Sequence, residues 1–258
     1  HMVLDNVDIM NNVGSGSSGG ILNEGTMTIM NSKISHNSSG SGSITNTGTL
    51  TSMNSDISDN TVSGSGGGIY NGNGELKLDN VSILNNYVGG GGSGGGLYHH
   101  RGKLKMNDVN ISNNSAGSNG GGIFIELADD GEYELANVTV THNELRSSQG
   151  SGRTPGGGGL YIMGDDSGRI SIRSSTFSHN TATRDGGGVT VVQGHLEMDN
   201  ITMEHNEAQY GAGMYITTGQ SVELNDIHIM NNTARSRGGG IYTSGADVKM
   251  TNFRVQDN

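Results

Sequence analysis

The chain has 258 residues, including 46 Gly, 1 Pro and 0 Cys, and its formal net charge is −11 at pH 7. The absence of Cys excludes a disulfide framework and any Cys-ligated metal. The acidic balance argues against binding to nucleic acid, which requires a basic stripe to displace counterions from phosphates. Hydrophobic residues make up only 31% of the chain, so a folded structure has to place them economically.

Both ends of the sequence indicate a fragment of a longer protein. His1 and Met2 resemble a cloning remnant, and the final FRVQDN stops inside a recurring phrase. No apolar stretch approaches the roughly 20 residues of a membrane helix, and there is no signal peptide. We expect one domain spanning residues 1–258, with any membrane attachment supplied by parts of the parent protein that are absent here.

A unit of about 26 residues recurs through the whole chain, and each copy is marked by an Asn. Two short alternating apolar runs precede the marker, and a third apolar position follows a cluster of Gly. Alternation with a period of two is typical of strands, whereas helical repeats would show apolar spacings of three and four. The marker residues are Asn12, Asn37, Asn60, Asn86, Asn114, Asn143, Asn180, Asn206, Asn232 and Asn258.

These units predict an all-β, single-domain parallel β-helix (a β-solenoid) of about ten coils, with three short strands per coil. One unit cannot bury its own apolar side, but stacked copies can, with neighbouring coils about 4.8 Å apart. We expect the marker Asn side chains to form a ladder at one corner. A second polar row, six residues before each marker, indicates a second corner: Asn6, Asn31, Asn54, Asn80, Asp108, Asn137, Ser174, Asn200, Asp226 and Asn252.

Two recurring tetrapeptides resemble a known pattern. ISHN, ISDN, ISNN, FSHN and MEHN are similar to the Phe-x-x-Asn tetrapeptide, and GGGI, GGGL and GAGM to the Gly-Gly-Ala-Ile/Leu/Val tetrapeptide, of chlamydial polymorphic outer membrane proteins and autotransporter adhesin repeats. The resemblance covers essentially the whole chain. It implies a right-handed helix and a secreted or cell-surface passenger region, associated with the outer membrane if the parent is an autotransporter.

An aromatic row follows the inward apolar position of the third strand. Because successive strand residues point to opposite faces, we expect these rings to face outward, where they would stack on sugar rings or contact a partner protein. The alternative is that they only stabilise the sheet by stacking on one another. The candidate binding residues are Tyr70, Tyr98, Phe124, Tyr161, Tyr215 and Tyr242.

Histidines precede the marker in three successive coils, at His142, His179 and His205. They are candidates for a shared divalent metal or a pH-sensitive patch. They also occupy a turn position that accepts any polar residue.

The repeat is least regular in its middle, with predicted loop insertions near 126–134, 144–156 and 163–168. An acidic-polysaccharide lyase or epimerase of this fold would need carboxylates to hold Ca²⁺ and an Arg to remove a proton. Asp-Gly pairs are, however, also ordinary turn chemistry. The residues available for this alternative are Glu126, Asp129, Asp130, Glu132, Arg146, Arg153, Asp165, Asp166, Arg169 and Arg184.

Taken together, these features favour a noncatalytic adhesin segment that binds a glycan, or a protein of a host or neighbouring cell, without a cofactor. The Ca²⁺-dependent carbohydrate-active enzyme is one alternative, and a purely structural spacer is another. Ice binding through threonine rows is disfavoured, since the Thr pairs do not persist from coil to coil.

Overall fold

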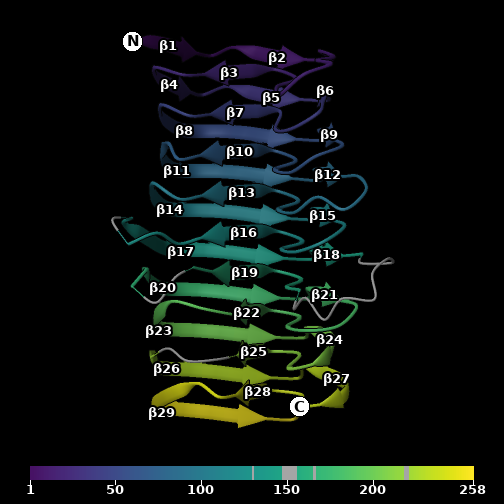
Figure 1. Ribbon diagram of the computed structural model, residues 1–258, viewed down its shortest axis with the longest axis vertical. Helices are drawn as coiled ribbons and strands as arrows, with labels where there is room; N and C mark the ends of the chain where they lie inside the picture. Colours follow the sequence, from purple (N-terminus) through teal and green to yellow (C-terminus); the bar gives the residue numbers. More distant parts are fainter. Residues whose placement is uncertain (130, 147–155, 165–166, 218–220) are drawn as a thin grey trace.

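A computed structural model of the protein describes residues 1–129, 131–146, 156–164, 167–217 and 221–258. These residues form a β-solenoid of stacked coils built from three parallel sheets, with the two termini at opposite ends (Figure 1). None of the described segments is a helix of sufficient length and apolarity to cross a membrane. The predicted all-β parallel solenoid with three strands per coil is confirmed.

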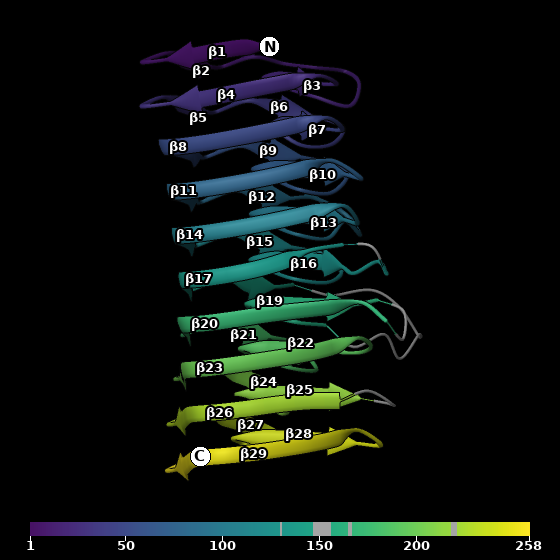
Figure 2. The same ribbon diagram turned by 90° about the vertical axis from the view of Figure 1, so that its left-hand side faces the viewer.

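Each sheet runs the length of the solenoid, because every strand pairs in parallel with its counterpart one coil away (Figures 1 and 2). The long-strand sheet contains β1 (Met2–Asp5), β2 (Asp8–Met10), β4 (Thr26–Met30), β5 (Lys33–Ser35), β8 (Thr49–Ser58), β11 (Glu75–Leu84), β14 (Lys103–Ser112), β17 (Tyr133–Thr141), β20 (Arg169–Ser178), β23 (His195–Glu204), β26 (Ser221–Met230) and β29 (Asp247–Gln256). The short-strand sheet contains β6 (Ser38–Ser39), β9 (Thr61–Val62), β12 (Tyr87–Val88), β15 (Ser115–Ala116), β18 (Glu144–Leu145), β21 (Thr181–Ala182), β24 (Glu207–Tyr210) and β27 (Thr233–Arg237). The return sheet contains β3 (Ile21–Asn23), β7 (Ile44–Asn46), β10 (Ile69–Gly72), β13 (Leu97–His100), β16 (Ile123–Glu126), β19 (Leu160–Met163), β22 (Val189–Val191), β25 (Met214–Thr217) and β28 (Ile241–Ser244).

The division of a coil into strands differs in detail from the prediction. The two alternating runs before each marker join into one continuous strand from β8 onward, and this strand bends at a corner residue such as Asn54. The short strand after the marker was not predicted, since two residues are too few to leave an alternating pattern. A coil therefore still has three strands, because two predicted strands are joined into one and an unpredicted short strand is added.

Two polar positions in every coil are corners with a left-handed backbone: the residue directly before each marker Asn and the residue six before it. At both positions φ lies between 48° and 58° in all ten copies. Asn, Asp and His are the side chains most enriched in this conformation. The row before the markers consists of Asn11, His36, Asp59, Asn85, Asn113, His142, His179, His205, Asn231 and Asp257.

The core consists of the predicted inward rows. Ile57, Ile83 and Ile111 occupy the same register position in β8, β11 and β14 and are fully buried. Some polar residues in these rows are hydrogen-bonded, whereas the buried Ser52 hydroxyl has no partner among the residues that the structure describes. The Ser55 hydroxyl, for example, accepts a hydrogen bond from the Ser32 amide at 3.1 Å and donates one to the Met53 carbonyl at 2.7 Å.

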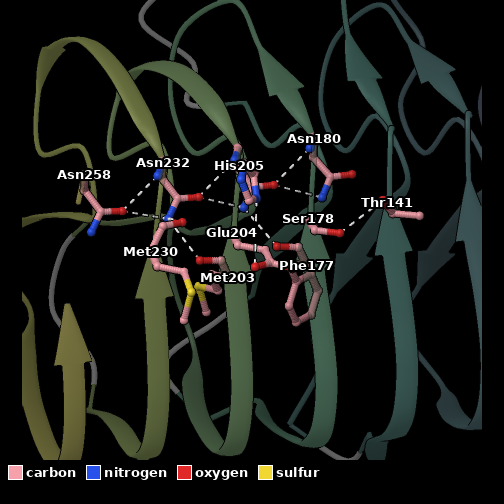
Figure 3. A network of polar contacts seen from close by, with 11 residues as sticks. Thr141, Phe177, Ser178, Asn180, Met203, Glu204, His205, Met230, Asn232 and Asn258 are labelled. Atoms are coloured by element: carbon pink, nitrogen blue, oxygen red, sulfur yellow. Dashed lines mark hydrogen bonds and ion pairs between the residues drawn. The ribbon is translucent and has the colours of Figure 1, made fainter. Parts of the chain in front are cut away.

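The marker Asn side chains form the predicted ladder through the interior (Figure 3). Asn206 is representative: its side-chain oxygen accepts hydrogen bonds from the backbone amide and side-chain amide of Asn180, at 2.9 and 3.1 Å. Its own side-chain amide donates to the Phe177 carbonyl and to the Asn232 side-chain oxygen, both at 2.9 Å. Each rung thus links three coils through buried hydrogen bonds.

The glycines that follow the markers permit close contact between backbones. A Cβ at Gly188 would lie 2.6 Å from the Gly213 carbonyl oxygen in the next coil. A side chain at this position would therefore push neighbouring coils apart, which is why glycine recurs here.

Candidate binding surfaces

The aromatic row of the return sheet forms two stacked columns. Tyr70, Tyr98, Phe124 and Tyr161 follow one another in β10, β13, β16 and β19, with ring centroids 5.0, 4.6 and 5.4 Å apart and nearly parallel planes. Tyr215 and Tyr242 form a second stack, 5.2 Å apart. Thr190 of β22 separates the two columns.

Most of this aromatic surface is used within the protein. Phe124 and Tyr161 are each only 4% exposed, so the expectation that they face solvent is wrong. Phe124 lies between the rings of Tyr98 and Tyr161, and Tyr161 lies between Phe124 and Thr190, which leaves little area for a sugar. Tyr70, Tyr98, Tyr215 and Tyr242 are half-buried and remain candidate binding residues.

Burial of the first column also affects its hydroxyl groups. Burial is the main reason that the pKa of Tyr98 is raised to about 12, and negative charge on Tyr70 and Glu126 adds to the effect. Burial likewise raises the pKa of Tyr161 to about 12. Both phenols therefore stay neutral at physiological pH.

One aromatic side chain outside this row is exposed. The chain has eight Tyr and three Phe, and within the described residues, which include all of them, Tyr87 of β12 is the only one classed as exposed, at 39%. The sequence did not single it out because it belongs to no repeated aromatic position. The guanidinium of Arg146 lies 5.3 Å from the centre of its ring.

The three predicted histidines stack on one another. His142, His179 and His205 have ring centroids 4.8 Å apart and planes within 8° of parallel. Parallel rings direct their nitrogen lone pairs side by side instead of toward a common point, which disfavours a shared metal in this arrangement. Partial burial, followed by positive charge on His142 and His205, lowers the pKa of His179, while Glu204 opposes the shift.

The left-handed corner explains why His occurs at these positions. The part of the chain that the structure describes contains no group of three or more His, Cys, Asp or Glu side chains arranged to hold a metal ion.

Those residues considered for lyase chemistry that the structure describes are not brought together. Arg146 follows β18 and pairs with Glu144, whereas Arg169 begins β20 on the opposite side of the coil in Figure 1. Arg184 lies 3.6 Å from Asp185, a carboxyl group whose pKa is raised by burial although Arg184 opposes this. Asp129 accepts a hydrogen bond from Ser167, and Glu132 pairs with Lys103 at 3.2 Å. Asp130, Arg153, Asp165 and Asp166 lie outside the described residues.

Glu126 instead joins a cluster that the sequence did not indicate. Its carboxylate contacts His100 Nδ1 at 2.7 Å and Arg101 Nε at 3.4 Å. The His100 and Glu126 side chains are 31% and 21% exposed, so both reach the surface beside Tyr98. The pairing follows from the register, because His100 and Glu126 are direct neighbours in β13 and β16.

A second interior ladder was also missed. Asn23, Asn46 and Asn71 are linked through their side-chain amides, and the Asn71 amide lies 3.0 Å from His99 Nδ1. His99 is fully buried, and its Nε2 has no hydrogen-bond partner. Burial, together with charge on His100, lowers the pKa of His99 to about 3, while a hydrogen bond to the Gly102 backbone opposes the shift.

Two segments of this chain match a known family. Residues 108–126 and 226–244 match the Chlamydia polymorphic membrane protein repeat. Each match begins at a second-corner Asp and ends in a return strand, so it contains the marker Asn and the Gly cluster. No curated protein and no solved structure shows significant similarity to the chain. The chain is a parallel β-helix repeat protein whose coils are similar to those polymorphic membrane protein repeats.

Proposed function

We propose that this chain is a noncatalytic segment of a passenger protein, secreted or displayed at the cell surface, that uses a side of its solenoid for adhesion to a glycan or to a protein of another cell. The observation that carries the proposal is the match of two coils to a repeat of membrane proteins. Those two coils have the same corners, ladder and sheet pairings as their neighbours, so the resemblance extends to the architecture of the whole described solenoid.

The physical properties of the fold suit this role. Continuous sheets and a buried Asn ladder connect all coils, which makes a stiff rod whose backbone groups are already paired and resist proteases. The sides present flat strand surfaces with half-buried tyrosines and alternating charged pairs such as Lys105 and Glu134, 2.9 Å apart. Such surfaces recognise a partner through several weak contacts distributed along the rod.

The purified chain tests this proposal on glycan arrays and on intact cells before and after enzymatic removal of surface glycans. We expect binding, and we expect Tyr70→Ala and Tyr242→Ala to weaken it with little change in thermal unfolding, since both side chains are half-buried at the surface. A chain that binds neither glycans nor cells, treated or untreated, would instead act as a structural spacer.

A second candidate is lyase activity on an acidic polysaccharide, and the pair formed by His100 and Glu126 is the observation that favours it. Glu126 orients the imidazole, which leaves the His100 Nε2 to remove a proton, while Arg101 lies beside them to hold a uronate carboxylate. Ca²⁺ would be an additional cofactor of this activity and would neutralise the substrate uronate. Incubation with polygalacturonate or alginate and Ca²⁺ would produce absorbance from unsaturated product, and His100→Ala would abolish it. No absorbance change with either polymer would eliminate this candidate.

A further inference from the structure

The exposed ring of Tyr87 stands between two hollows on the short-strand sheet. One hollow, of about 440 Å³, is lined by Tyr87, Val88, Gly90, Gly91, Ala116, Gly117 and Arg146. The other, of about 430 Å³, extends from Tyr87 in the opposite direction, past Thr61 and Ser38 to Gly14. Because Tyr87 lines both, the two hollows adjoin at its ring and follow successive coils of the short-strand sheet; together they are called the groove below.

The groove is largely uncharged. The second hollow is lined by Ser, Thr and Gly residues besides Val62 and Tyr87. Among the described residues that line the first hollow, only Arg146 is charged; it pairs with Glu144 at 2.6 Å, and its guanidinium lies 5.3 Å from the centre of the Tyr87 ring. This surface contrasts with the net charge of −11 of the whole chain.

Hydroxyl groups, glycine backbone and one exposed aromatic ring match the chemistry of a neutral sugar. Sugar hydroxyls exchange hydrogen bonds with Ser and Thr side chains and with backbone groups, and the apolar face of a pyranose packs on an aromatic ring. Among the described residues that line the groove, Arg146 is the one cation, and it is already paired with Glu144. A neutral glycan is therefore a better fit than an acidic one.

The repeat also sets the spacing of these groups. Ser38, Thr61 and Tyr87 are successive Cα partners in β6, β9 and β12. They therefore recur about every 4.8 Å, close to the length of one sugar residue in an extended glycan chain. Successive sugars would meet equivalent positions of successive coils.

We propose that the groove formed by the two hollows around Tyr87 binds a neutral, linear oligosaccharide, with one sugar ring packed on Tyr87. This assignment rests on the adhesive function proposed above and names its ligand class and site. It adds a site on the short-strand sheet to the half-buried tyrosines of the return sheet, such as Tyr70 and Tyr242.

The test uses the full chain and three neutral probes, cellopentaose, maltopentaose and N-acetylchitopentaose, with oligogalacturonate as the acidic comparison, measured by titration calorimetry. We expect at least one neutral probe to bind, Tyr87→Ala to weaken it about tenfold, and Tyr87→Phe to retain it. Tyr210→Ala, which removes a half-buried ring from the same sheet, serves as the matched control and should bind normally.

Gly91→Trp provides a second variant that does not depend on removing Tyr87. A Cβ at Gly91 meets no heavy atom within 4 Å, so the new side chain fills the first hollow without straining the fold. Gly25 is equally unobstructed but does not line either hollow, and Gly25→Trp is its control. Loss of binding in Gly91→Trp alone, with unchanged thermal unfolding, supports the groove.

Three outcomes would overturn the assignment. Normal binding by both Tyr87→Ala and Gly91→Trp would place the glycan elsewhere on the solenoid and leave the adhesive function intact. Preference for oligogalacturonate would contradict a neutral ligand. Binding to deglycosylated cells without binding to any neutral probe would indicate a protein partner, so the groove assignment would fail while adhesion would stand.

Discussion

The Asn ladder allows a quantitative prediction at Asn206, which is 1% exposed. Asn206→Ala removes the four side-chain hydrogen bonds of this rung, two accepted from Asn180 and two donated to Phe177 and Asn232. Each buried hydrogen bond contributes about 0.5–1.5 kcal/mol net. We therefore expect the free energy of unfolding to fall by roughly 2–6 kcal/mol, with the upper part of the range favoured because the Asn180 backbone amide is left buried without its partner.

Asn12→Ala is the matched control. Asn12 belongs to the same ladder but is exposed in the first coil, so water can replace its lost hydrogen bonds and the expected cost is below about 1 kcal/mol. Urea denaturation followed by circular dichroism gives both values. Hydrogen exchange should additionally show faster exchange of the Asn180 amide in Asn206→Ala.

Equal, small effects of Asn206→Ala and Asn12→Ala would refute the reasoning. That result would mean that the ladder contributes little beyond filling space, and that the stacked apolar rows alone hold the coils together.

The remaining predictions concern single side chains. His99→Ile removes the buried Nε2 that has no partner and continues the Ile row of the following coils, but it also removes the partner of the buried Asn71 amide. The two effects oppose each other, so thermal unfolding should change by less than the equivalent of about 1 kcal/mol; a larger shift in either direction would contradict this. The pKa of His99 is about 3 when folded and near 6.5 when unfolded, so acidification from pH 6.5 toward 3 protonates it preferentially in the unfolded chain and destabilises the fold. Denaturation at several pH values should therefore show a weaker loss of stability over this range in His99→Ile than in the unmodified protein. Gly188→Ala should cost more than about 2 kcal/mol because its Cβ meets the Gly213 carbonyl, whereas Gly25→Ala, which meets nothing, should change stability by less than about 0.5 kcal/mol. Tyr161→Ala should lower the unfolding free energy by about 3–5 kcal/mol, as expected for a buried residue. An unchanged unfolding curve together with impaired ligand binding would mean instead that Tyr161 is exposed and contacts the ligand.

The features predicted best from the sequence are those that every coil repeats. Ten copies of the marker Asn, each at a fixed distance from alternating apolar residues, determine the stacking, the inward rows and the ladder. Because the same pattern recurs in ten copies, single exceptions such as Ser52 or Ser175 do not obscure the conformation that the pattern predicts.

The features missed are those that depend on contacts between particular coils. The outward direction of Phe124 and Tyr161 follows from alternation, but their burial depends on the residues at the same position in the adjacent coils. The inner row that contains Asn71 and His99 continues as Ile125 and Ile162, so its polar part extends over only a few coils. Tyr87 is the aromatic residue in a row that is otherwise made of Ser, Thr and Glu from β6 to β27, and only the hollows on both sides distinguish it.

The parallel pairing of every strand with its counterpart one coil away also determines how the protein responds to force. The hydrogen bonds between coils run along the solenoid axis, and the termini lie at opposite ends (Figure 1). Tension applied at the two termini pulls directly along these hydrogen bonds. The bonds between one pair of coils therefore break before those of the next pair, instead of all being sheared at the same time. Because each coil contacts mainly its neighbours, the rod should lengthen in discrete steps. Each step would release one unit of about 26 residues, or roughly 85–90 Å of extended chain, which would give an attached cell a tether that absorbs load gradually.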